Sequence, residues 1–364
     1  MKPYFTFLTG MLLTSLYAQN TSNPIVLNIR GGENTGGLAT GNNNELSSFS
    51  DYSKAELNRG WGEFADLLTK TGFDPQEIRE GKLKTGCEVQ ISIPCSDPID
   101  FAGMDLAKYS VIIMGSNNSR YDKSAVDAVM RYIEQGGGIL FMSDGNFGRD
   151  YRAAPWSDQP FLDRFGLIMD QDNGYYPIKK SGGDFLIPEH PLLKGVDEFN
   201  GEGVNPISFS KKIEGIKVEI IAKAKMQVRR NVNSDGTPIG NSNQGKGPLT
   251  DANNNDASLI SAEYGKGRAV FIYDRNCFFN DGAKTSSMAQ VNNKQLALNI
   301  MEWVKRKSSV SNRLKTDHWV SKNSGPLVHP LFNAKGQYSG TNKVTDMHTP
   351  PNRVQLFLNG LGRQ

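Results

Sequence analysis

Two apolar runs decide the fold of this chain: Tyr109-Ser110-Val111-Ile112-Ile113-Met114-Gly115 and Gly136-Gly137-Gly138-Ile139-Leu140-Phe141-Met142-Ser143-Asp144-Gly145-Asn146. Each is typical of a buried strand that ends in small polar residues. Between the runs, Asp122 can cap a helix with apolar residues at helical spacing, and Gly136 supplies a left-handed stop. A crossover this short joins parallel neighbours, so the runs predict a right-handed strand–helix–strand unit.

Elements on both sides extend this unit. The β-rich run 25–29 predicts a first strand, and the capping-box spacing from Ser53 to Glu56 predicts a helix that ends at Gly72. A loop-rich insertion at about 171–256 contains one alternating strand pattern, and its end, 231–256, is expected to be an exposed loop. Further predicted elements are a short helix at 158–166, a strand at 217–222, a hairpin around Gly265-Lys266-Gly267, and a last helix over 293–307.

Length and charge limit the possible functions. With 364 residues the chain can form about two units or one enlarged domain. It carries 41 Lys and Arg against 38 Asp and Glu, and no run of about five or six basic residues occurs. This balance argues against a nucleic-acid partner.

The first residues predict secretion. Residues 1–18 combine Lys2, a short apolar centre and a small-residue exit at Ala18, which is typical of a signal peptide and too short for a membrane span. We expect cleavage near Ala18 and a secreted, extracellular product, periplasmic in a Gram-negative bacterium; an uncleaved anchor is the alternative. No later stretch approaches the roughly 20 apolar residues of a membrane span. The mature chain is then a body at 19–306 and an irregular tail at 307–364.

A secreted protein reaches an oxidising environment, in which disulfides can form between its three cysteines. Cys87 and Cys95 can close a small loop, and we predict a disulfide between them, with unpaired thiols as the alternative. Cys277, beside Phe278 and Phe279, is expected to be a buried free thiol that packs as a small apolar group.

With these elements placed, residues 24–306 resemble the class I glutamine amidotransferase-like superfamily, in its secreted ThuA-like and related uncharacterised branch. The resemblance rests on the first strand and helix, the Gly115-Ser116-Asn117-Asn118 turn, Glu189-His190-Pro191-Leu192-Leu193-Lys194-Gly195-Val196, and Tyr264-Gly265-Lys266-Gly267-Arg268 followed by Asp274. It implies an α/β, flavodoxin-like fold, in which a mostly parallel sheet is sandwiched by helices, with the insertion and the extended tail added.

The chain departs from that superfamily at the nucleophile. Catalytic members carry a Cys in a tight turn after a central strand, whereas the corresponding turn here reads Ser143-Asp144-Gly145-Asn146-Phe147-Gly148. Amidotransferase chemistry is therefore not carried over, and the resemblance implies a fold and a cleft.

Polar side chains follow several predicted strands. In open α/β sheets ligands bind outside the carboxyl ends of the strands, so these residues are expected to share one edge. Their amides, carboxylates and guanidinium groups suit a polyhydroxylated or anionic ligand, although the same residue types also build ordinary turns. The predicted ligand-binding residues are Arg30, Asn117, Asn118, Asn146, Arg149, Arg152, Asp274 and Arg275.

Two residues are candidates for acid–base catalysis. Asp144 ends a buried strand, where desolvation can raise its pKa, and His190 stands in a polar loop; a helix cap and a turn residue are the respective alternatives. No complete catalytic set accompanies them. We therefore expect a domain that binds a carbohydrate-type ligand or an extracellular protein, with a hydrolase or other carbohydrate-processing enzyme using Asp144 and His190 as the alternative. The sequence indicates no cofactor and no metal site.

Overall fold

The predicted strand–helix–strand unit lies at the centre of the protein's main sheet. In the computed structural model, β3 (Val111–Ser116), α2 (Lys123–Glu134) and β4 (Gly138–Met142) follow one another, and β3 pairs with β4 in parallel. Asp122 caps α2 by accepting a hydrogen bond from the backbone N–H of Ala125 at 2.9 Å, and Gly136 adopts φ 107°. The predicted N-cap at Asp122 and the predicted helix stop at Gly136 are both confirmed.

The structure describes most of the body and two short pieces of the tail. These are residues 23–30, 47–52, 60–81, 97–116, 119, 121–142, 159–170, 175–202, 204, 206–225, 227–230, 249–282, 286–305, 328–332 and 338–343.

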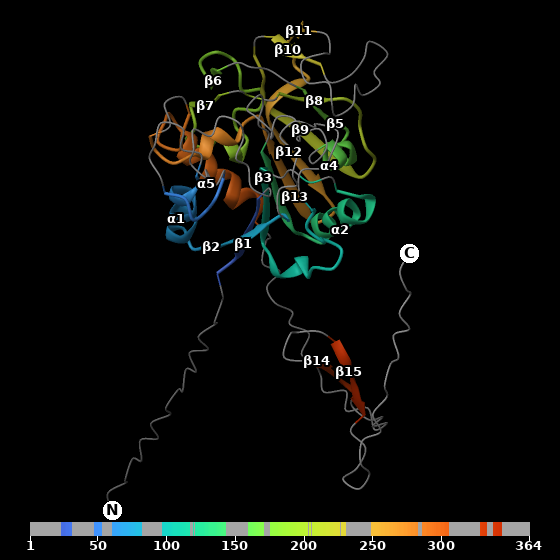
Figure 1. The fold of residues 1–364 in the computed structure, drawn as a ribbon. Coiled ribbons are helices and arrows are strands. Elements are labelled where there is room, and N and C mark those ends of the chain that lie inside the picture. Colours follow the sequence, from blue (N-terminus) through green and yellow to red (C-terminus); the bar gives the residue numbers. More distant parts are fainter. Residues whose placement is uncertain are drawn as a thin grey trace, which may run out of the picture. The chain divides into compact units, whose positions relative to one another are not determined.

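The main sheet has nine strands, a parallel part and an antiparallel part (Figure 1). In the parallel part the order is β2 (Asp74–Arg79), β1 (Ile25–Arg30), β3, β4 and β13 (Gly267–Ile272). The antiparallel part adds four strands: β12 (Asp256–Tyr264), β9 (Ile216–Lys223), β8 (Ile207–Phe209) and β5 (Leu167–Met169). The predicted mixed α/β architecture and the hairpin formed by β12 and β13 are confirmed.

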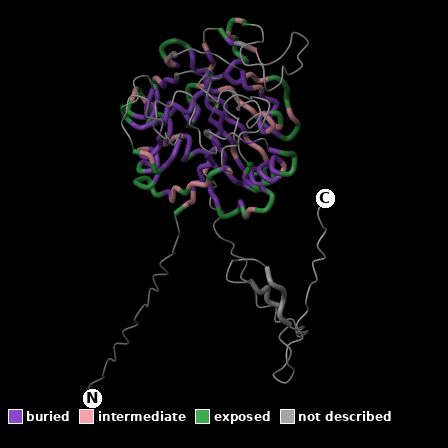
Figure 2. The backbone as a smooth tube through the Cα atoms, in the orientation of Figure 1, coloured by how far each residue is buried: buried purple, intermediate pink, exposed green. Residues whose placement is uncertain are grey.

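Helices cover both faces of the sheet, because apolar side chains alternate along the strands. On β1, Val26 packs in the core beneath α1 (Gly62–Lys70) and α5 (Asn293–Val304), whereas Leu27 packs in the core beneath α2. The short α4 (Gln159–Leu162) joins the α2 side. Buried backbone therefore fills the middle of the body, as Figure 2 shows.

Smaller elements complete the body. They are two strand pairs, β6 (Tyr175–Lys179) with β7 (Glu198–Glu202) and β10 (Gln227–Arg229) with β11 (Leu249–Asp251), and four short 3-10 helices, η1 (Leu106–Lys108), η2 (Asp163–Phe165), η3 (Pro191–Leu193) and η4 (Arg275–Phe278).

Two local expectations differ from the structure. Helix α1 begins at Gly62, with Trp61 at its N-cap, rather than at the Ser53 capping box, and residues 53–59 lie outside the described residues. Of the expected exposed loop at 231–256, residues 231–248 lie outside the described residues. The described end contains β11 and the first residue of β12, Asp256, which is 1% exposed and forms an ion pair with Arg230.

The tail forms a compact unit of its own, residues 308–364, and carries a hairpin of β14 (Val328–Phe332) and β15 (Tyr338–Lys343). Its strands contain proline, glycine and polar residues, so the sequence pattern there is too weak to predict them. In the described parts of the chain, no helix has the length and apolar character needed to cross a bilayer.

Candidate functional site

Arg30 ends β1 at the carboxyl edge of the sheet and forms a buried ion pair there. Its side chain is 5% exposed, and Nη1 donates to Oε1 of Glu77 on the neighbouring β2 at 2.9 Å. Parallel register places Asn28 opposite Glu77, and Asn28 Nδ2 donates to Glu77 Oε2 at 3.1 Å. The Glu77 carboxylate therefore joins the last residues of β1 to β2.

The segment after Ser47 closes over this pair. Phe49 N–H donates to Glu77 Oε2 at 2.7 Å, and Asn28 Nδ2 donates to the carbonyl of Ser47 at 2.8 Å. Trp61 N–H donates to the carbonyl of Ser48 at 2.7 Å. Three buried atoms around this segment, Asn28 Oδ1, Ser47 Oγ and Trp61 Nε1, have no hydrogen-bond partner among the described residues. Buried polar atoms rarely lack a hydrogen-bond partner, so these three atoms mark this end of β1 as a candidate polar site.

Asp274 and Arg275 follow β13 at the same edge. Asp274 is fully buried and caps η4 by accepting from the N–H of Asn276 at 2.9 Å. Arg275 is 1% exposed. The sheet order places β3 and β4 between β1 and β13, so Arg30 and Asp274 share an edge and stand three strands apart.

A buried acid at this edge was not predicted. Glu80 follows β2, is 3% exposed, and accepts hydrogen bonds through Oε1 from the Tyr121 hydroxyl at 2.6 Å and from Ser119 N–H at 3.2 Å. Because β2 has no alternating apolar pattern, the sequence does not reveal where this strand ends. Glu80 adds a carboxylate between the ends of β2 and β3.

A second unpredicted group surrounds Asn200 on β7. The Asn200 side chain accepts from Asn293 Nδ2 at 2.7 Å and donates to Gln290 Oε1 at 2.8 Å. The backbone carbonyl of Asn200 accepts from the Cys277 thiol at 2.8 Å. Burial, reinforced by nearby Asp274, raises the pKa of Cys277 well above its ordinary value. The predicted buried free thiol is thus confirmed, and it lacks the thiolate character of a nucleophile.

His190 lies at the opposite edge of the sheet from these groups. Its ring centroid is 5.5 Å from that of Trp303, near the end of α5, and the guanidinium of Arg268, near the start of β13, lies over the same indole at 4.8 Å. Arg268 is the second residue of β13 and Asp274 lies two residues past its end, so at about 3.3 Å per residue they are separated by roughly 20 Å. The structure therefore does not bring His190 together with the carboxyl-edge residues.

The local role of His190 is a cap. Its Nδ1 accepts from the N–H of Leu192 at 3.2 Å, at the start of η3. Burial lowers the pKa of His190. This turn role was the alternative considered from the sequence.

The other predicted residues fall outside the described part of the chain. These are Asp144, Asn117, Asn118, Asn146, Arg149 and Arg152, together with the proposed disulfide partners Cys87 and Cys95.

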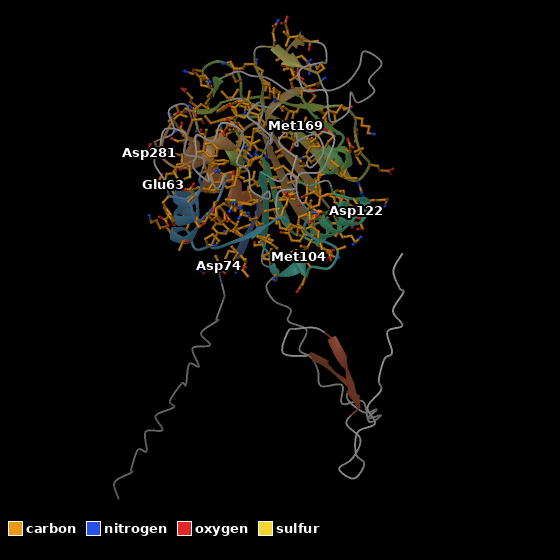
Figure 3. The ribbon with its side chains drawn as sticks, viewed as in Figure 1. Glu63, Asp74, Met104, Asp122, Met169 and Asp281 are labelled. Carbon is orange, nitrogen blue, oxygen red and sulfur yellow. The ribbon has the colours of Figure 1, made fainter. Side chains whose placement is uncertain are left out.

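Two clefts flank α1. One, of about 380 Å³, lies between α1 and the start of α5, and its charged lining includes Glu63 and Asp281. Asp281 N–H donates to Glu63 Oε2 at 2.8 Å, and the two residues appear together in Figure 3. The other, of about 290 Å³, lies between α1 and β2 and includes Tyr52 and Glu77. Within the described ranges, no group of three or more His, Cys, Asp or Glu side chains could hold a metal ion.

A charged network in the antiparallel part of the sheet is structural. Arg230 donates through Nη2 to Asp256 Oδ2 at 2.9 Å and through Nη1 to Asp170 Oδ2 at 3.2 Å, and Ser208 Oγ donates to Asp256 Oδ1 at 2.8 Å. Burial is the largest single effect on Asp256 and by itself would raise its pKa, but the hydrogen bonds from Arg230, Asn253 and Ser208 and the Arg230 charge together outweigh it, so the pKa is lowered. These groups tie β10, β8 and β12 together.

Comparisons with known proteins find partly similar solved structures and assign no family. No family model matches the chain, and no curated protein sequence matches it. Among solved structures, a cytoplasmic protein from Salmonella typhimurium is similar over 78% of this chain and 99% of its own, at 17% identity and a TM-score of 0.41. A putative ThuA-like protein from Parabacteroides merdae is similar over 80% of this chain and 94% of its own, at 11% identity and a TM-score of 0.40. A putative ThuA-like protein from Bacteroides uniformis is similar over 79% and 94%, at 14% identity and a TM-score of 0.36.

Proposed function

We propose that the chain is a secreted binding domain of flavodoxin-like architecture, which holds a polar, carbohydrate-type ligand or an extracellular partner at the carboxyl edge of its sheet. The observation that carries the proposal is the set of buried charges at that edge: Arg30, Glu80, Asp274 and Arg275 are each at most 4% exposed. Charged side chains are rarely buried so completely, since their desolvation costs free energy. Their concentration at the edge where α/β sheets bind ligands favours a recognition site.

The chemistry of the edge suits a ligand with many hydroxyl groups. Guanidinium groups donate, carboxylates accept, and the unpartnered atoms of Asn28, Ser47 and Trp61 comprise an acceptor, a hydroxyl and an indole donor. A hydroxyl-rich ligand can both donate to and accept from such a set.

Binding is favoured over catalysis by the position of His190. A hydrolase that used Asp144 and His190 would need both side chains within hydrogen-bond reach. Asp144 follows β4, which ends at the carboxyl edge, whereas His190 lies beside Trp303 at the other edge. The high pKa of Cys277 likewise gives no support to a thiol nucleophile.

A thermal-shift screen of residues 19–364 against sugars, sugar acids, nucleotides and divalent metals tests the proposal. A ligand at 100 times its dissociation constant adds about 2.7 kcal/mol of stability. The shift should disappear in Asp144→Asn and Asp274→Asn. It should persist in Glu263→Gln, a carboxylate-to-amide change at a half-exposed residue paired with Arg268 at the opposite edge. A ligand whose shift survives both edge variants contradicts the proposed location, and the absence of any shift favours a protein partner, to be sought by pull-down.

A further inference from the structure

The cleft between α1 and β2 adjoins the Arg30–Glu77 ion pair, because Glu77 is one of its lining residues. It contains none of the four buried charges of the proposed carboxyl-edge site, Arg30, Glu80, Asp274 and Arg275. Helix α1 packs beside this edge strand (Figure 1). The cleft has a volume of about 290 Å³, close to the lower end of small-ligand sites. Phe49 and Ala65 give it apolar walls, and its remaining lining residues are Ser50, Tyr52, Asp66, Thr69, Pro75 and Glu77.

Tyr52 is an exposed aromatic side chain that is nevertheless held in place. It is 50% exposed, yet its hydroxyl donates to Asp66 Oδ1 at 3.0 Å. A Cβ atom added to Gly62 would lie 2.7 Å from Cγ and Cδ1 of Tyr52, so the ring rests directly against the backbone of Gly62. Two independent contacts therefore fix the ring while half of it faces solvent.

A fixed, exposed ring is a prepared binding surface. Tyrosine offers a large amphipathic area, and immobilising it before binding removes an ordering cost that a ligand would otherwise have to offset. The hydrogen bond to Asp66 and burial both raise the pKa of Tyr52, so the hydroxyl stays protonated and keeps donating at neutral pH.

The remaining groups define the ligand's charge. Among the described residues no ion pair reaches Asp66, so its carboxylate gives the cleft an acidic character, while Glu77 is neutralised by Arg30. Thr69 Oγ1 donates to the carbonyl of Ala65 at 3.0 Å and so offers its lone pairs to a donor. Acceptors around an aromatic surface suit a neutral ligand that has both C–H faces and hydroxyl donors, and they disfavour an anion.

We propose that this cleft binds a neutral sugar ring, with a C–H face of the sugar on Tyr52 and sugar hydroxyls donating to Asp66 and Thr69. The cleft adjoins the proposed carboxyl-edge site through Glu77, but the residues that would contact the sugar, Tyr52, Asp66 and Thr69, do not belong to that site.

The test is calorimetric titration and saturation-transfer NMR of residues 19–364 with methyl β-glucoside, methyl β-galactoside, methyl α-mannoside and N-acetylglucosamine. At least one of these sugars should bind saturably. Tyr52→Ala and Tyr52→Leu should each weaken binding by about tenfold or more, and Asp66→Asn should also weaken it. The leucine variant retains apolar contact with Gly62, so a melting curve like that of the wild type separates lost recognition from lost folding.

Two variants serve as controls. Tyr264, at the end of β12, is another tyrosine that interacts with a carboxylate, that of Glu134 on α2. Tyr264→Ala should leave sugar binding unchanged. Asp274→Asn should also leave it unchanged, which distinguishes this cleft from the carboxyl edge. Failure of all four sugars to saturate overturns the proposal, as does binding that survives both Tyr52 variants. Binding of arginine methyl ester in place of any sugar would also overturn it, because it would mark the cleft as a cation site.

Discussion

The His190 imidazole packs against the Trp303 indole, with ring centroids 5.5 Å apart, and so ties the loop before η3 to the end of α5. Its Nδ1 accepts the Leu192 N–H, which means that the neutral ring is the form the fold uses. Four charged neighbours act on it in opposing pairs, Glu219 and Glu263 against Lys217 and Arg268, and burial decides the direction by lowering the pKa.

Protonation of His190 should therefore destabilise the fold. Because its folded-state pKa lies below the ordinary value of about 6.5, the contribution of His190 to stability is complete above that pH and is lost as pH falls through the lowered pKa. Unfolding free energies measured by urea titration between pH 8 and pH 5 should show this decline. In His190→Asn the amide oxygen replaces Nδ1 as the cap and does not titrate, so the variant should lose less stability on acidification; equal slopes would remove His190 from the pH dependence.

Replacement of Arg230 should be among the most costly changes in the chain. Asp170 and Asp256 are each 1% exposed, and Arg230→Gln removes the guanidinium that lies between them. Breaking a buried ion-pair network typically costs about 3–5 kcal/mol. The control is Lys217→Gln, whose partner Glu219 lies 2.9 Å away in an exposed pair, and which should change stability by about 0.5 kcal/mol or less. An Arg230→Gln loss no larger than that of the control would show that the network contributes little.

The fold was predictable where the sequence carries local signals. The apolar runs around 111–116 and 138–142, the Asp122 cap and the left-handed Gly136 all appear in the structure as expected, because each depends on neighbouring residues alone. The sequence indicates short β-like pieces within 74–108 but does not delimit strand β2, since Asp-Pro-Gln-Glu-Ile-Arg has no alternation and its place depends on pairing with β1. The start of α1 was misplaced because Gly60 and Gly62 are needed for the close approach of Asp51 and Tyr52, a tertiary contact.

The candidate site was predictable only as an edge. Sheet topology brings Arg30 and Asp274 to the same side, as the strand-end rule requires, but the loop containing His190 has no such rule and lies at the other edge. Glu80, Tyr121 and Asn200 were not found from the sequence, because each acquires its role from residues far away along the chain.

Relief of backbone strain at Val291 should stabilise the protein. Val291 has φ 44°, a left-handed conformation that β-branched residues rarely adopt, and it is 46% exposed. Its neighbours hold it there, since Asn292 Oδ1 accepts from the N–H groups of Asp197 and Glu198 at 3.0 and 3.2 Å. Val291→Asn, which tolerates this conformation, should gain roughly 1 kcal/mol. Val291→Ala removes the branch at Cβ but lacks the polar side chain with which Asn stabilises this conformation, so it should gain less; a loss of stability in the Asn variant would show that the valine side chain contributes packing that outweighs the strain.

Thiol titration should separate Cys277 from the other two cysteines. Cys277 is fully buried, donates to the carbonyl of Asn200, and has a raised pKa, so it should react with a thiol reagent only when the protein unfolds. If Cys87 and Cys95 form the predicted disulfide, denatured, unreduced protein should release one equivalent of reactive thiol, and denatured, reduced protein three. Cys277→Ala should abolish the single equivalent and leave two after reduction. Three equivalents without a reductant would disprove the disulfide, and rapid reaction of the native protein that is absent from Cys277→Ala would show that the core around Asn200 opens readily.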